Sequence, residues 1–258
     1  MSKEQVIPFW GPEQLELFEL MAQAIDPEGQ LQEAMQAVAP IENRLLLDVG
    51  AGVGDRTIIY ARLASHVYAL EPDPTAKPIL QGRIKSSKLT NVTVVPASAE
   101  AIPLNDNCVD VAYATWAYFF GPGSEPGLEE IQRVVRPGGD VLVVQNYGHD
   151  ELSRFWDPRE SECQTWPAWF SEHGFTCEVV DTVWRFRTQD EALAVLEFLW
   201  GEPARVYVLE SGKLEFGYKV AIYHLRVPKD TPPAGHDVTS RQMGRDTLPS
   251  GNSQDKDN

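Results

Sequence analysis

Short apolar runs and segments of helical period follow one another along most of the chain. Apolar runs that are bounded by turn residues are typical of strands buried on both faces of a parallel sheet. By this criterion the pattern predicts seven strands. They are Arg44–Val49, His66–Leu70, Val92–Val95, Val109–Ala114, Val141–Val144, Phe175–Arg187 and Gly217–Arg226. The sixth alternates apolar and polar residues, which predicts a half-exposed antiparallel edge strand.

Segments with apolar residues three or four positions apart lie around these strands and predict helices. They are Glu13–Ile25, Glu28–Val38, Arg56–Ala64, Thr75–Lys85, Gly127–Val135, Trp166–His173, Gln189–Trp200 and Ala204–Glu210. The broad apolar stripe of the first helix predicts that it packs against the sheet or covers its functional edge. The run Arg136-Pro137-Gly138-Gly139 is predicted to be a turn between the fifth helix and the fifth strand.

Composition divides the chain into three parts. Residues 1–40 contain the first two helices and are predicted to form a helical cap, and residues 41–228 are predicted to form an α/β domain. After Pro228 apolar residues give way to Pro, Gly, Ser, Asp and Thr. Such a segment cannot bury enough surface to fold, so residues 229–258 are predicted to be a disordered tail.

Composition and charge exclude several classes of function. The 258 residues are 43% hydrophobic, which is enough to build one core. A formal net charge of −16 argues against nucleic acid or anionic lipid as the principal partner, because either requires a basic face. No apolar run approaches the ~18 to 20 residues of a membrane span, and the amino terminus lacks the blocks of a signal peptide. We therefore expect a cytoplasmic enzyme with a small-molecule partner, either a monomer or a homodimer.

The clearest chemical signal is a glycine bend after the first strand. Gly50, Gly52 and Gly54 stand at alternate positions immediately before a helix. Glycine accepts positive φ and lets the backbone approach a ligand closely, so this unit predicts a nucleotide-binding crevice. Its G-x-G-x-G spacing differs from the G-x-G-x-x-G of dinucleotide folds. Asp48 and Asp55 would repel a pyrophosphate, but they suit a ligand with an ammonium or sulfonium charge.

The segment Asp48–Gly54 resembles the first motif of the class I S-adenosylmethionine-dependent methyltransferases, of the small-molecule, type 11-like kind. The resemblance covers residues 41–145 closely. It implies a Rossmann-like, doubly wound α/β sheet in which two closing strands, one of them antiparallel, join five parallel strands, with helices on both faces. It also implies S-adenosylmethionine as the cofactor. The predicted cofactor-binding residues are Asp48, Gly50, Ala51, Gly52, Gly54, Glu71, Pro72, Ser98, Ala99, Glu100 and Thr115.

Two of these positions have a chemical role that the sequence indicates. Glu71 follows the second strand about 20 residues beyond the bend, where a carboxylate accepts the ribose hydroxyls of an adenosine. A solvated loop acid is the alternative. Ser98 stands where the family often has an aspartate that holds the adenine amino group, and a hydroxyl can still form that hydrogen bond. Ala99 would contribute its amide, and Glu100 either a second polar contact or a cap of the next turn.

The acceptor side is less well defined. Many relatives have histidines after the fourth strand, but this chain has aromatic residues there. These form either an aromatic wall of the acceptor pocket or plain packing. The predicted substrate-binding residues are Trp10, Trp116, Tyr118, Phe119, Asn146 and Tyr147. Tyr147 and His149 are the candidates for taking a proton, although a lone loop histidine is commonly solvated. The three cysteines form no CxxC pair, so no metal site is predicted.

The leading interpretation is transfer of a methyl group to an O, N or C atom of a small molecule. A catalytically silent S-adenosylmethionine-binding protein is the first alternative, because the histidines after the fourth strand are missing. An NAD-dependent oxidoreductase is the second. Glu71 permits it, but the glycine spacing and Asp48 oppose it.

Overall fold

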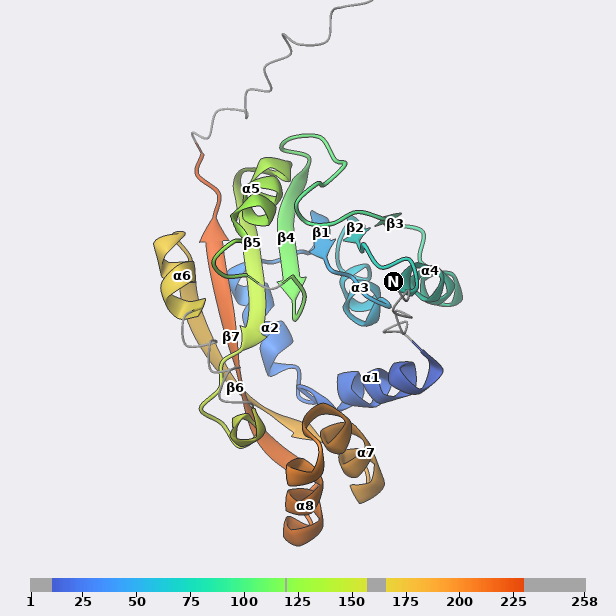
Figure 1. Ribbon diagram of the computed structural model, residues 1–258. Helices are drawn as coiled ribbons and strands as arrows, with labels where there is room; N and C mark the ends of the chain where they lie inside the picture. The colour runs from blue at the N-terminus through green and yellow to red at the C-terminus, as the bar shows by residue number, and fades with distance from the viewer. Residues whose placement is uncertain (1–10, 119, 157–165, 230–258) are drawn as a thin grey trace, which may run out of the picture.

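A mixed seven-stranded sheet runs through the protein (Figure 1). The structure, a computed structural model, describes residues 11–118, 120–156 and 166–229. The strands are β1 (Leu45–Val49), β2 (His66–Leu70), β3 (Val92–Val95), β4 (Val109–Thr115), β5 (Val135–Asn146), β6 (Thr176–Arg185) and β7 (Glu215–Arg226). Their order is β3-β2-β1-β4-β5-β7-β6. The first five strands are parallel and β7 is antiparallel to both β5 and β6, which confirms the predicted sheet.

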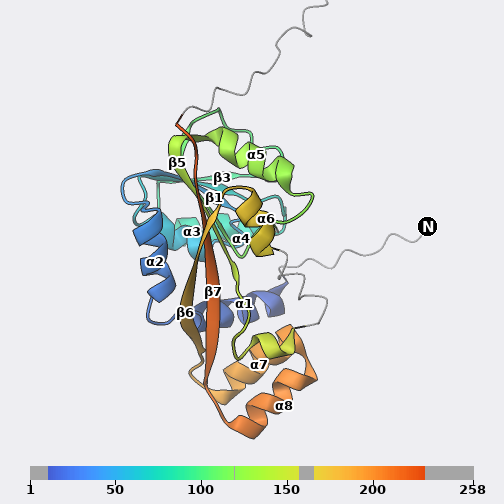
Figure 2. The same ribbon diagram turned by 90° about the vertical axis from the view of Figure 1, so that its left-hand side faces the viewer.

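Helices cover both faces of this sheet. They are α1 (Pro12–Ala24), α2 (Gln30–Val38), α3 (Asp55–Tyr60), α4 (Ala76–Ser86), α5 (Glu125–Val134), α6 (Trp166–Glu172), α7 (Gln189–Trp200) and α8 (Glu202–Ser211), with a 3-10 turn at Ser153–Phe155. In Figure 2 the sheet is seen along its edge, with α2 on one side and α5 and α6 on the other. The doubly wound arrangement that the resemblance implied is therefore confirmed.

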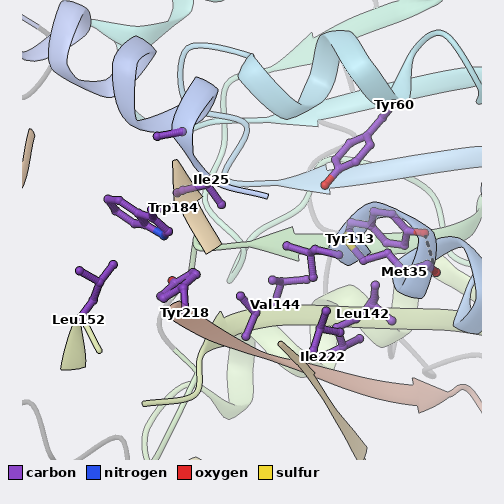
Figure 3. Packing of buried hydrophobic residues seen from close by; sticks show 14 of the residues in the cluster. Ile25, Met35, Tyr60, Tyr113, Leu142, Val144, Leu152, Trp184, Tyr218 and Ile222 are labelled. Carbon is purple, nitrogen blue, oxygen red and sulfur yellow. Dashed lines mark hydrogen bonds between the residues drawn. The ribbon is translucent and has the colours of Figure 1, made fainter. Parts of the chain in front are cut away.

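Burial on both faces explains the continuous apolar runs. Along β1, Leu46 joins the core cluster beneath α2 and α3, while Leu47 joins the cluster beneath α5. Successive strand residues point to opposite faces, so a strand between two helical layers needs apolar residues at every position. Figure 3 shows the first cluster, with Tyr60 and Tyr113 near one end and Trp184 near the other.

The helix after the glycine bend is shorter than predicted. It ends at Tyr60 rather than at Ala64, and residues 61–64 form turns. The side-chain amide of Asn91 donates hydrogen bonds to the carbonyls of Ala61 (2.8 Å) and Ala64 (3.0 Å). A side chain from a distant loop thus satisfies carbonyl groups that otherwise need helical partners. Periodicity within the segment carries no sign of such a contact.

The fifth strand is longer than predicted, because it includes the Pro-Gly-Gly segment. Val109 pairs with Val135, and after a register shift Val111 pairs with Asp140. The extra residues bulge out of the pairing, with Gly138 at φ 74°. A Cβ on Gly139 would lie 2.6 Å from the carbonyl oxygen of Asp110, so the strands approach too closely there for a side chain. The segment is a bulge within a strand rather than the predicted turn.

The predicted division into cap, domain and tail remains a prediction. Of the cap, α1 contacts α7 and β6, and α2 contacts β6 and β7. Residues 1–10 and 230–258 lie outside the described residues. Within the part of the chain that the structure describes, no helix combines the length and the apolar character needed to cross a membrane.

A buried carboxylate joins the first and last parts of the domain. The side chain of Asp140 is 1% exposed and forms ion pairs with Arg44 (3.1 Å) and Arg226 (2.7 Å). His224 Nε2 lies 3.0 Å from the same carboxylate. Although burial opposes ionisation, these partners hold the pKa of Asp140 below its usual value. Asp140 therefore ties β5 to β7 and to the segment before β1.

We predict that Asp140→Asn lowers the free energy of unfolding at pH 7 by about 3 kcal/mol, because it leaves two guanidinium groups without their buried partner. The folded-state pKa of Asp140 is depressed, so its contribution is present above the unfolded value near pH 4 and is lost as the pH falls further. Urea unfolding should show a constant difference between parent and variant from pH 7 to about 5 and a smaller one below about 4. A difference that grows on acidification would contradict this account.

Candidate functional site

The glycine bend lies at the carboxyl ends of β1 and β2. The amides of Gly50 and Ala51 both donate to the carbonyl of Leu70, at 2.9 Å each. A Cβ on Gly50 (φ 71°) would lie 2.4 Å from the Cβ of Ala117, and a Cβ on Gly54 (φ 94°) would lie 2.5 Å from Leu80 Cδ1. We predicted close approach to a ligand. At Gly50 and Gly54, however, the structure shows close approach to the protein's own chain.

Glu71 holds the bend from the end of β2. One carboxylate oxygen accepts a hydrogen bond from the Gly52 amide and the other from the Asp73 amide, at 2.7 Å each. Asp73 Oδ1 in turn accepts from the amide and hydroxyl of Thr75, at 2.7 Å each, immediately before α4. Glu71 is 7% exposed, and a carboxylate has about four acceptor sites. It therefore keeps acceptor capacity for a ligand.

A cavity of about 440 Å³ opens beside this bend. Nine of the residues predicted for the cofactor and acceptor line it, from four separate loops. They are Gly50, Gly52, Glu71, Pro72, Ser98, Ala99, Glu100, Trp116 and Tyr118. The volume is within the range of roughly 300 to 1,000 Å³ that small-molecule pockets occupy. The structure thus brings together segments that are up to about 70 positions apart in the chain.

Asp48 does not line this cavity, contrary to our expectation. Its side chain is buried beneath the bend, where Oδ2 accepts a hydrogen bond from the Thr57 hydroxyl at 2.6 Å. Burial raises the pKa of Asp48 to about 6, against the opposite effect of the Thr57 hydrogen bond. The alternation of β1 directs Asp48 toward α3 rather than toward the crevice. Ala51 and Gly54 likewise do not line the cavity.

Trp116 is fixed at the cavity wall by three contacts. Its amide donates to the Val144 carbonyl (3.0 Å), and its indole N–H donates to Asn146 Oδ1 (2.8 Å). Its ring stacks on Tyr218 with centroids 6.5 Å apart. Its φ of 47° is unusual for a bulky side chain and requires such support. Asn146 itself does not line the cavity but holds the tryptophan that does.

Tyr118 and Glu100 face each other in the cavity. Burial opposes ionisation of Glu100, but hydrogen bonds from its own amide and from the hydroxyls of Tyr118 and Ser98 lower its pKa. The Tyr118 hydroxyl also donates to the Ser124 carbonyl at 3.4 Å. Burial and Glu100 together raise the pKa of Tyr118 to about 12. Gly127 provides the space for this ring, because a Cβ there would lie 2.3 Å from the Tyr118 hydroxyl. Neither group is suited to take a proton near neutral pH.

The remaining predicted residues lie away from the cavity. The Thr115 hydroxyl is 2.8 Å from the Tyr60 hydroxyl, behind the wall. Tyr147 and His149 have ring centroids 5.9 Å apart, and His149 is exposed. Neither of these two proton-accepting candidates lines the cavity. Both Gly148 (φ 78°) and His149 (φ 55°) have positive φ in this loop. Trp10 and Phe119 lie outside the described residues.

Other residues at the site were missed. Val49, Leu70, Asp73, Ala97 and Ala117 also line the cavity, and each is adjacent in sequence to a predicted residue. The guanidinium of Arg56 lies 5.3 Å from the Trp116 ring centre. In the sequence, only the position of Arg56 directly after the glycine bend indicated a place at the site. Among the described residues no group of three or more His, Cys, Asp or Glu side chains is arranged to hold a metal ion.

Comparisons with known proteins agree with this geometry. Residues 47–143 match the family model described as a methyltransferase domain. An uncharacterized methyltransferase of Mycobacterium tuberculosis is 31% identical over 120 residues, which are 46% of this chain and 47% of that protein. An uncharacterized protein of the same organism is 27% identical over 229 residues, 88% of this chain and 73% of that protein. This chain thus spans about half the length of the mycobacterial methyltransferases that it matches at 31% identity.

Solved structures share the fold. A SAM-dependent methyltransferase from Aquifex aeolicus superimposes with a TM-score of 0.54 at 19% identity, over 81% of this chain and 96% of that one. Together with the match to the family model, this likeness indicates a methyltransferase domain over residues 47–143 with the fold of known SAM-dependent methyltransferases.

We predict that Gly50→Ala destabilises the fold more than Gly29→Ala. Both glycines have positive φ (71° and 76°), but a Cβ on Gly29 meets no atom within 4 Å. Gly29→Ala should therefore show only the backbone penalty of about 1 to 2 kcal/mol. Gly50→Ala should add about 1 to 3 kcal/mol from its collision with Ala117. Urea unfolding of both variants measures the difference. Equal losses of unfolding free energy would show that the bend shifts to accommodate the added methyl group.

The raised pKa of Asp48 predicts a pH dependence of stability. The group ionises near pH 4 when unfolded and near pH 6 when folded, so the parent protein loses stability as the pH rises between these values. Asp48→Asn keeps an acceptor for Thr57 and removes the titration. Between pH 4 and 7, the parent's free energy of unfolding should fall by roughly 2 to 3 kcal/mol relative to the variant. If the free energy of unfolding of the parent and the variant changed with pH in parallel, the folded-state pKa of Asp48 would not be raised.

Proposed function

We propose that this methyltransferase domain binds S-adenosylmethionine in the 440 Å³ cavity and transfers its methyl group to a small-molecule acceptor. The single observation that carries the proposal is the meeting of Glu71 and the Gly52 amide at the cavity wall, 2.7 Å apart. An acid joined to a glycine bend at the ends of two adjacent parallel strands can hold a sugar and an amino-acid group side by side. The spare acceptor capacity of Glu71 fits the ribose hydroxyls.

The rest of the cavity fits the remaining parts of the cofactor. Ser98, Ala99 and Glu100 form its wall beyond Glu71 and offer a hydroxyl, an amide and a carboxylate to the adenine edge. Gly50 and Gly52 leave room for the methionyl end, which carries an ammonium group. The aromatic rings of Trp116 and Tyr118 suit the neighbourhood of a sulfonium, because a cation is attracted to the face of an aromatic ring.

A small-molecule acceptor is supported by two further relatives. A sterol 4-C-methyltransferase of Caenorhabditis elegans is 28% identical over 44% of this chain and 36% of that protein. A ubiquinone/menaquinone biosynthesis C-methyltransferase of Burkholderia orbicola is 32% identical over 44% of this chain and 45% of that protein. Both act on small molecules by their names. The net charge of −16 also disfavours a nucleic-acid acceptor.

The bound cofactor supplies an electrophilic methyl carbon. Glu71 and the glycine bend would hold the cofactor so that an electron pair of the acceptor could form a bond to this carbon, and the sulfur would leave as a neutral thioether with the electron pair of the broken bond. The protein's part is to orient the two reactants and exclude water. With Tyr118 protonated and Glu100 ionised at neutral pH, the described cavity wall favours an acceptor atom that loses its proton easily or has none to lose.

A catalytically silent cofactor-binding protein is the second candidate. The observation that favours it is the position of Tyr147 and His149 away from the cavity. Incubation with methyl-labelled S-adenosylmethionine and a small-molecule extract separates the two. Label in a product supports the enzyme, and tight cofactor binding without transfer to any fraction supports the silent protein.

We predict that Glu71→Gln weakens binding of S-adenosylhomocysteine about 10- to 100-fold, because the loss of a charged hydrogen-bond acceptor costs roughly 1.5 to 3 kcal/mol. The matched control is Glu42→Gln, which removes the same charge from an exposed position. Isothermal titration calorimetry measures both, with NAD as a second ligand. Binding of NAD in place of S-adenosylhomocysteine, or an unchanged affinity of Glu71→Gln, would overturn the assignment.

A further inference from the structure

Arg56 differs from most arginines of the described chain in forming no ion pair with a carboxylate, although its charge lowers the pKa of the buried Asp48. Eight arginines form ion pairs with carboxylates: Arg44, Arg83, Arg133, Arg136, Arg185, Arg187, Arg205 and Arg226. In the same part of the chain Arg56 makes no hydrogen bond and no ion pair, although it is only partly exposed. A guanidinium has five N–H donors, and in a chain this acidic its isolation is informative.

The ring of Trp116 determines how Arg56 is presented. The guanidinium carbon lies 5.3 Å from the ring centre. When a guanidinium contacts an aromatic ring, its N–H donors can still point outward in its own plane. In that plane a guanidinium can bind a carboxylate with two parallel hydrogen bonds. Trp116 is itself immobilised by Asn146 and Tyr218. The cation is thus held in place by a fixed platform rather than by an acid.

Arg56 stands between the cofactor cavity and a second one. Trp116 lines the first, and Arg56 lines a neighbouring cavity of about 450 Å³ between α1, α3 and α4. That second cavity also contains Asp55 and Glu19, but both carboxylates form ion pairs with Arg83. Asp48 is fully buried and bonded to Thr57. Asp48 interacts with Arg56 only through its charge and forms no ion pair with it. Among the described residues, the donors of Arg56 therefore remain without an acceptor.

We propose that Arg56, held by Trp116, is the binding site for the carboxylate of a ligand in the active site. The proposal rests on the proposed function, which supplies two sources of this group. One is the methionyl carboxylate of the cofactor, whose amino-acid end the glycine bend receives. The other is a carboxylate on the acceptor, which would enter from the second cavity. The chemistry is the same in both cases, a bidentate ion pair with the guanidinium edge.

Paired probes with and without a carboxylate test this proposal and identify the source. S-adenosylhomocysteine and 5′-methylthioadenosine share the thioadenosine group, but only the first has the carboxylate. Benzoate and benzamide form a second pair, titrated with and without S-adenosylhomocysteine present. We expect Arg56→Gln to weaken binding of one carboxylate ligand at least tenfold and to leave its neutral counterpart unchanged. Loss in the first pair assigns the cofactor's carboxylate, and loss in the second assigns the acceptor's.

Two further variants separate a specific contact from a general effect. Arg62→Gln removes an equal charge from an exposed position six residues along the chain and should bind every probe like the parent protein. Arg56→Lys keeps the charge without the fork and should show an intermediate loss. Near-ultraviolet circular dichroism verifies that Trp116 is undisturbed in each variant. If Arg56→Gln binds S-adenosylhomocysteine and benzoate like the parent, the proposal is wrong. If the parent binds neither thioadenosine compound, the proposed function fails, and the benzoate pair still tests Arg56.

Discussion

The hydrogen bond between the Glu71 carboxylate and the Gly52 amide is the constraint on which the site depends. It joins the end of β2 to the bend that follows β1, and the second oxygen of Glu71 fixes the turn that leads into α4. The Leu70 carbonyl adds two more bonds from the bend. A glycine-rich segment has high conformational freedom when unfolded, so it needs several such partners to keep one shape. Here the partners are the groups at the end of the adjacent strand, and the same acid that orders the bend also faces the ligand cavity.

Sequence patterns predicted the strands and most of the cavity wall, because both follow from short-range rules. An apolar run ends where its strand leaves the core, so polar and small residues just after β1, β2 and β4 had to lie at one edge of the sheet. The same rules did not reveal the orientation of single side chains. Asp48 lies one position inside β1 and is directed toward Thr57, and the space that a Cβ of Gly50 would need is occupied by Ala117. Such contacts join residues from distant segments, and no local period records them.

The aromatic residues show a similar division between local and distant causes. Their density after β4 indicated a wall, but the sequence did not show which ring would face the cavity and which would support it. Trp116 lines the cavity. Behind it, Tyr218 contacts Trp184, and Trp184 contacts Trp200 of α7, with ring centroids 5.5 and 5.9 Å apart. Rings packed in this way resist displacement, because moving one leaves a void against the next. The position of Trp116 is thus determined from as far away as the helical pair α7 and α8.

The support behind Trp116 therefore comes from the late part of the chain, outside the segment that matches the family model. The loop after β5 is bound to that part by its acids. The Glu151 carboxylate accepts from Lys213 at 2.7 Å and from the Gly217 amide at 3.2 Å, and Asp150 accepts from the Lys219 amide at 3.0 Å. These bonds place the loop between β7 and α8, where Figure 1 shows the helical pair at the end of the long strands β6 and β7. Residues 47–143 match the family model, whereas residues after 150 hold this loop, so the loop can differ between proteins that share the domain without any change in the matched segment. The positions of this loop and of Trp116 are consequently a property of tertiary contacts with β7 and the helical pair, and the motifs of residues 47–143 carry no information about them.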